Sequence, residues 1–132
     1  MAMMDGGYYK EIVLRNIAGV YGLAKRGKAT YSVGDRLVHV RYKSPSANMR
    51  FPFNISRTTL KADYELWICG DEKAYYLIPI EIIRKMYDDP NAYHDKMHPN
   101  LTVVTCSTAD DRVTFAKGGK SIYLSQYKNI RL

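Results

Sequence analysis

The sequence has few cysteines and no long apolar run. Its 132 residues include two cysteines, Cys69 and Cys106, which lie far apart in apolar, strand-like surroundings. We therefore expect reduced core thiols and no disulfide framework. No apolar stretch approaches the ~18 residues that a membrane span needs. The first residues also lack a basic start followed by an apolar stretch, so we expect no secretory signal, a cytoplasmic setting and no membrane partner.

Acidic residues are scarce in the first half of the chain. The whole sequence carries 20 Lys and Arg against 13 Asp and Glu, a formal net charge of +7. Residues 1–62 hold eleven basic against three acidic side chains, a balance of +8, whereas residues 63–132 hold nine against ten, a balance of −1. Because the whole excess lies in one half, that half favours association with nucleic acid or another anionic surface.

Hydrophobic and aromatic residues are plentiful. Hydrophobic residues make up 46% of the chain and charged residues 25%, which is typical of a folded protein. The length suits one compact core, so we expect residues 1–132 to form a single domain. The chain also has twelve tyrosines. Most should pack their rings in the interior, while Tyr31 and Tyr42 lie where they would stack on bases.

Hydrophobic periodicity predicts two helices. Apolar residues recur at intervals of three and four over residues 8–24, with Asp5 leading into the helix and a glycine among cations ending it near residues 25–28. Pro79 suits the first turn of a second helix, which runs to about Tyr87 with its isoleucines and methionine facing inward.

Short alternating or apolar segments between turn residues predict strands. They cover residues 29–33, 37–44, 51–56, 64–69, 74–78, 101–107, 113–116 and 121–124. Together with the two helices, they predict an α/β domain. We expect a single mixed sheet flanked by helices, with β-hairpins at the C-terminal end.

Three basic side chains at every second position form the most informative pattern. His39, Arg41 and Lys43 alternate with two valines and a tyrosine, so an extended strand turns all three toward one face. Neighbours on that face lie roughly 6.5–7 Å apart, close to twice the ~3.4 Å rise per nucleotide of one B-DNA strand. We expect this cationic ladder to lie at the surface and contact phosphates. Further basic residues would widen the contact: Arg26, Lys28, Arg50 and Arg57.

Four segments, in this order after the first helix, carry a family likeness. They are Val-His-Val-Arg-Tyr-Lys-Ser at 38–44, Phe-Pro-Phe-Asn-Ile at 51–55, Ala-Asp-Tyr-Glu-Leu-Trp-Ile-Cys-Gly at 62–70 and Tyr-Tyr-Leu-Ile-Pro at 75–79. This order resembles the PD-(D/E)XK, or restriction-endonuclease-like, superfamily of nucleases over residues 8–87. The resemblance implies a restriction-endonuclease-like fold and a nucleic-acid partner.

The same resemblance implies a damaged catalytic centre. In that family an aspartate and the acid of an acid-x-Lys strand hold a divalent metal, but here the corresponding triplet is His39-Val40-Arg41. Magnesium prefers oxygen ligands, so we expect no cofactor. An active enzyme would have to relocate its acids to Asp35 and Glu11, hold Mg or Mn with His39 beside them, and use Arg41 in place of the lysine.

Each of these candidate residues also has a purely structural interpretation. Asp35 suits a turn after a glycine, Glu11 suits a solvated helix surface, and His39 suits a half-buried strand position with a satisfied hydrogen bond. Arg41 and Lys43 on the same face require a paired anion or a ligand, because burying them alone is costly.

Three functions follow from these patterns. We expect a protein that binds nucleic acid, DNA rather than RNA, without nuclease activity. The alternatives are a metal-dependent DNA endonuclease that uses the relocated acids, and a subunit that docks an acidic protein partner. A homodimer is left open.

Overall fold

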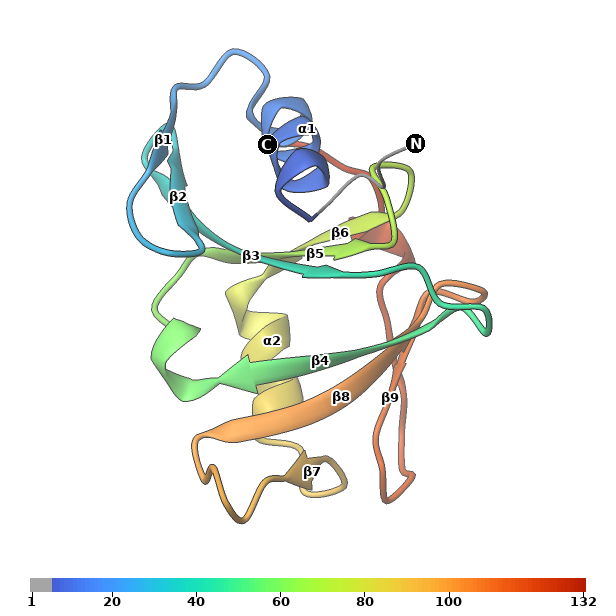
Figure 1. Cartoon of the computed structure of the whole chain (residues 1–132). Coiled ribbons are helices and arrows are strands. Elements are labelled where there is room, and N and C mark those ends of the chain that lie inside the picture. Colours follow the sequence, from blue (N-terminus) through green and yellow to red (C-terminus); the bar gives the residue numbers. More distant parts are fainter. Residues whose placement is uncertain (1–5) are drawn as a thin grey trace.

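The computed structural model describes residues 6–132, so the expected role of Asp5 lies outside the described residues. The chain is an α/β protein with two α-helices and two sheets (Figure 1). Helix α1 (Gly6–Ala18) covers one face of the first sheet, and helix α2 (Ile80–Tyr87) and the second sheet lie against the other. No helix among residues 6–132 is long and apolar enough to cross a membrane.

Helix α1 is shorter than its apolar pattern predicts. Its buried side is Val13, Leu14, Ile17 and Ala18. Gly19 then takes a positive φ of 56°, a helix-ending conformation that glycine adopts easily. The predicted continuation to residue 24 is wrong, because Val20 is 97% exposed and the chain enters strand β1 (Leu23–Lys25).

The first sheet, which we call sheet A, has the strand order β1-β2-β3-β5-β6. The predicted hairpin is confirmed, since β2 (Thr30–Val33) pairs antiparallel with β3 (Arg36–Lys43). Strand β3 then runs parallel to β5 (Tyr64–Cys69), which pairs antiparallel with β6 (Tyr75–Pro79). Sheet A is therefore mixed, as expected.

The second sheet, sheet B, corrects the expectation of a single sheet. Strand β4 (Arg50–Ser56) leaves sheet A and pairs along its whole length with β8 (Leu101–Ser107). The remaining strands of sheet B are β7 (Tyr93–His94), β9 (Arg112–Thr114) and β10 (Ile122–Tyr123). Pairing of β8 with β9 and of β9 with β10 confirms the hairpins near the C-terminus. Short 3-10 turns, Arg57–Thr59 (η1) and Ser125–Tyr127 (η2), complete the chain.

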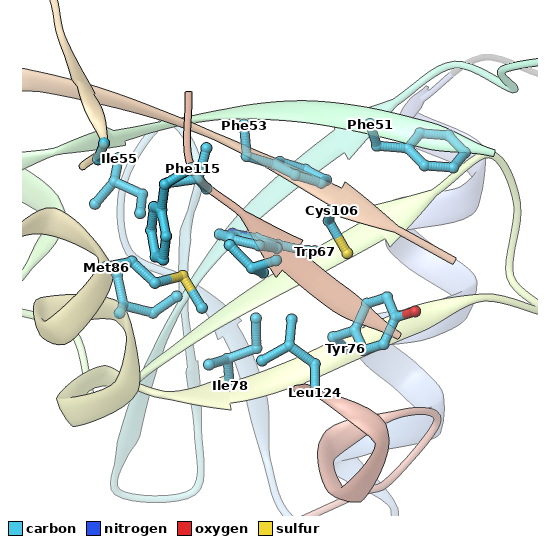
Figure 2. Close-up of a cluster of buried hydrophobic side chains, with 14 of the residues drawn as sticks. Phe51, Phe53, Ile55, Trp67, Tyr76, Ile78, Met86, Cys106, Phe115 and Leu124 are labelled. Carbon is cyan, nitrogen blue, oxygen red and sulfur yellow. The ribbon is translucent and has the colours of Figure 1, made fainter. Parts of the chain in front are cut away.

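Two apolar cores hold these layers together. One lies between α1 and sheet A, and the larger lies between sheet A, sheet B and α2 (Figure 2). In the larger core the rings of Phe53 on β4 and Trp67 on β5 stack with centroids 4.3 Å apart. Strand β4 buries alternate residues against sheet A, which explains why its alternating pattern is compatible with a second sheet.

Candidate functional site

Strand β3 sorts its side chains onto two faces as the alternation predicts. Val38 and Val40 are buried in the core under α1. The cationic ladder takes the opposite face, beside the β5 residues that pair with β3. That face looks toward sheet B and is less exposed than expected, because His39 is only 7% exposed. The expectation of a fully surface-borne ladder is therefore wrong at His39, while Arg41 and Lys43 are half-buried.

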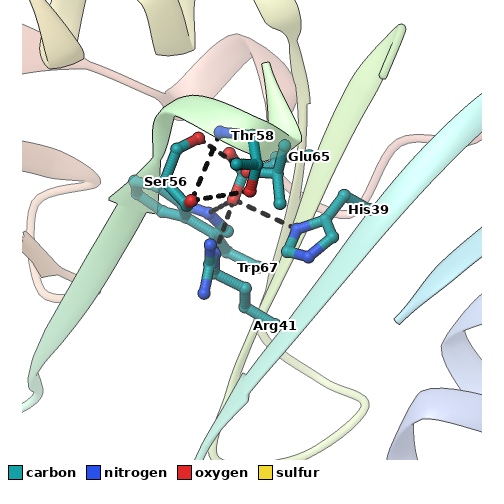
Figure 3. Close-up of polar contacts among 7 residues, drawn as sticks. His39, Arg41, Ser56, Thr58, Glu65 and Trp67 are labelled. Atoms are coloured by element: carbon teal, nitrogen blue, oxygen red, sulfur yellow. Dashed lines mark hydrogen bonds and ion pairs between the residues drawn. The ribbon is translucent and has the colours of Figure 1, made fainter. Parts of the chain in front are cut away.

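A buried carboxylate on β5, Glu65, meets this ladder. Glu65 pairs in register with His39 and is 0% exposed. Its Oε1 accepts hydrogen bonds from Arg41 Nε at 2.9 Å and from Trp67 Nε1 at 3.1 Å (Figure 3). His39 Nδ1 lies 3.7 Å from the same oxygen. A carboxylate of the chain itself thus neutralises Arg41, one of the three residues expected to contact phosphates.

The pairing fixes Arg41 without using all of its donors. Glu65 takes only Nε, and the two terminal guanidinium nitrogens have no partner within residues 6–132. Burying a carboxylate is costly unless donors face it, which accounts for the position of Arg41 and Trp67. A guanidinium held at Nε presents its outer nitrogens in a fixed plane, the geometry that binds the oxygens of a phosphate or carboxylate.

Arg41 belongs to the lining of an open pocket of about 230 Å³. The pocket lies beyond Thr30, the first residue of β2, which pairs with His39, along the part of β3 that continues to Lys43. Its polar side chains come from three elements: Lys10 on α1, residues His39, Arg41, Tyr42 and Lys43 on β3, and Asn54 on β4. We call this the β3 pocket. Because Glu65 offsets Arg41, and neither lysine has an ion pair in the described chain, the β3 pocket is cationic and suits an anion.

The acids proposed for a metal centre do not join this pocket. The Asp35 side chain is 95% exposed in the β2–β3 turn, with its nearest cation Arg36 at 3.5 Å. Glu11 lies on the exposed side of α1, 2.7 Å from Arg15, and α1 covers the face of sheet A opposite to His39. Within residues 6–132 no three His, Cys, Asp or Glu side chains are grouped to hold a metal. The structure thus does not bring Asp35, Glu11 and His39 together.

The other predicted contact residues lie in two places. Arg26 and Lys28 are exposed in the β1–β2 turn, where Arg26 Nε donates to Ser32 Oγ at 3.0 Å. Arg50 and Arg57 are exposed at the two ends of β4, the strand that contributes Asn54 to the β3 pocket. None of these four arginine and lysine residues lines the β3 pocket itself.

Sequence reasoning missed Glu65, although a signal for it was present. The segment 64–69 is expected to be a strand, and Glu65 is the one charged residue among its mostly apolar and aromatic side chains. A carboxylate in such a strand requires a cation nearby, and the ladder on another strand supplies it. The pairing of β3 with β5, which is not local in the sequence, was the missing information.

No family model, no curated protein and no solved structure matches this chain.

Proposed function

We propose that this chain binds nucleic acid through its basic first half and does not cleave it by metal-dependent chemistry. The observation that carries the proposal is the β3 pocket, which Lys10, Arg41 and Lys43 line together. This arrangement suits a phosphate group, because a fixed guanidinium supplies directed hydrogen bonds and two lysines supply charge. The charge excess of residues 1–62 supports a phosphate backbone as the source of that group.

The proposal revises the role first expected for the ladder. Lys43 and Lys10 would contact phosphate directly, Arg41 would do so only through its outer nitrogens, and His39 would stand behind them. Arg26, Lys28, Arg50 and Arg57 would add exposed charge around this contact. DNA stays the favoured partner.

A distant relation to the PD-(D/E)XK superfamily is part of the proposal. On that view His39 stands where the acid of the acid-x-Lys strand belongs, and the nearest carboxylate comes from the neighbouring strand as Glu65. Glu65 is engaged by Arg41 and Trp67, so it is a poor candidate for a metal ligand. The separation of Asp35 and Glu11 from His39 likewise favours a binding protein over a nuclease.

A titration with labelled single- and double-stranded oligonucleotides across a range of salt tests the binding. In the variant Lys10→Ala/Lys43→Ala we expect the slope of log K against log salt to fall by about 0.9 per lost duplex contact and about 0.7 per single-strand contact. The matched control is Lys117→Ala/Lys120→Ala, which removes the same charge from exposed positions between β9 and β10. Its slope should stay at the wild-type value.

Two results would contradict the binding proposal. One is the failure of the wild-type protein to shift any oligonucleotide at low salt, which would favour docking to an acidic protein instead. The other is an equal loss in both double variants, which would assign the effect to net charge alone. Incubation with plasmid DNA and Mg or Mn tests the second half of the proposal, because nicking would show an active nuclease.

A further inference from the structure

A second basic pocket is formed by residues that follow β4 in the sequence. It has a volume of about 460 Å³ and its charged lining is Arg57, Lys61, Arg84 and Asp88. Three cations against one carboxylate make this pocket, which we call the η1–α2 pocket, cationic as well. Two of these cations, Lys61 and Arg84, were absent from the sequence-based set of contact residues.

The cations of the η1–α2 pocket are available to a ligand. Arg84 is held in place because its Nη2 donates to the carbonyl of Leu60 at 2.6 Å, and its Nη1 and Nε have no partner within the described chain. Arg57 and Lys61 are exposed, and neither side chain has an ion pair or hydrogen bond among residues 6–132. As with Arg41, one donor of an arginine is anchored and the others are left for an anion.

The end of strand β4 connects the two pockets. Asn54 lines the β3 pocket and Arg57, at the start of η1, lines the η1–α2 pocket. Asn54 and Arg57 are three residues apart in the sequence, so their Cα atoms lie at most about 10 Å from each other. A strand of nucleic acid that follows this stretch of chain would place phosphates of different nucleotides in the two pockets.

We propose that the two pockets form one track that binds a single strand of nucleic acid, with one phosphate in each pocket. This inference rests on the proposed function and adds a length requirement to it. A ligand of several nucleotides would reach both pockets, whereas a dinucleotide, which has a single internucleotide phosphate, would occupy one. Asp88 then acts as a carboxylate that weakens the second contact.

The test compares oligothymidylates of two and eight nucleotides by fluorescence anisotropy at low salt. Simultaneous binding at two linked sites raises affinity by about a hundredfold or more, so the octamer should bind far more tightly than the dimer. Arg57→Ala/Lys61→Ala should cost the octamer at least about tenfold and the dimer at most about twofold. Lys117→Ala/Lys120→Ala is again the matched control and should preserve the length dependence.

A gain-of-affinity variant guards against misfolding as an explanation. Asp88 is exposed, and its side chain has no partner among the described residues. Asp88→Asn should tighten octamer binding several-fold and leave the dimer unchanged, which an unfolded variant cannot do. Failure of every oligonucleotide to bind wild-type protein would overturn the proposed function. An octamer that binds Arg57→Ala/Lys61→Ala as tightly as wild type would overturn the track and leave the proposed function standing.

Discussion

One face of sheet A has two regions of opposite character. Over β5 and β6 this face is apolar, and Trp67, Tyr76 and Ile78 are each 0% exposed beneath sheet B and α2. Over β3 the same face carries the cationic ladder and opens into the β3 pocket. The difference follows from coverage, because β4 is the edge strand of sheet B and the sheet ends there. A polar face is tolerated where the second sheet stops.

Glu65 marks the boundary between the two regions. It lies two residues before Trp67 on β5, and its Oε1 accepts from Trp67 on the covered side and from Arg41 on the open side. A buried carboxylate with two donors costs far less than one without them. The covered region should therefore determine stability, and the open region should determine what the protein binds.

The largest effect is expected in the covered region, at Trp67. Trp67→Ala removes a fully buried ring that stacks on Phe53 and also removes a donor to Glu65. We expect the free energy of unfolding to fall by about 4 kcal/mol, measured by urea denaturation. Trp67→Phe, which keeps an aromatic ring, should cost clearly less. A loss below about 1 kcal/mol for alanine would remove the contrast between the two regions.

A somewhat smaller effect is expected at the boundary. Arg41→Ala leaves Glu65 buried without its cation, and we expect the free energy of unfolding to fall by about 3 kcal/mol. Adding Glu65→Gln should recover much of this loss, since a neutral amide oxygen still accepts from Trp67 Nε1 and carries no buried charge.

Lys43→Ala is the matched control for Arg41→Ala. Lys43 lies on the same face of β3, two residues from Arg41, and has no ion pair within the described chain. Its removal should change stability by less than about 0.5 kcal/mol. Equal losses at Arg41 and Lys43 would contradict the structural role assigned to Glu65.

Local patterns in the sequence predicted most elements of the fold. The segments predicted at 64–69 and 101–107 are β5 and β8 residue for residue, and the helix after Pro79 is α2. Strand β1 was missed because Gly19 ends α1 early, and the apolar residues after it had been assigned to the helix. Hydrophobic periodicity indicates which residues share a face of a helix. It does not indicate the residue at which the helix ends.

Long-range pairing set the limit of prediction for the site. The alternation on β3 correctly separated valines from cations, but no local pattern states that β5 lies alongside β3 or that β4 joins β8. Both facts decide the site, since the first brings Glu65 to Arg41 and the second makes β4 an edge beside the β3 pocket. The charge of the ladder was visible in the sequence, and its partner was not.

The smallest effect is expected for the reactivity of Cys69, which lies in the covered region and pairs with a residue of the open region. Lys43 on β3 is in register with Cys69 on β5, and Cys69 is 4% exposed. A hydrogen bond with Cys106, together with burial, raises the pKa of the Cys69 thiol well above its ordinary value. A raised pKa keeps the thiol protonated at neutral and mildly alkaline pH, and the protonated form is a poor nucleophile.

A thiol-reactive disulfide reagent at pH ~8 should therefore leave the cysteines of the folded protein unmodified and should modify both cysteines in denaturant. The variant Lys10→Ala/Lys43→Ala should give the same result. Rapid labelling of Cys69 in the folded chain would show that solvent reaches the covered region, and the division of this face by coverage would then be wrong.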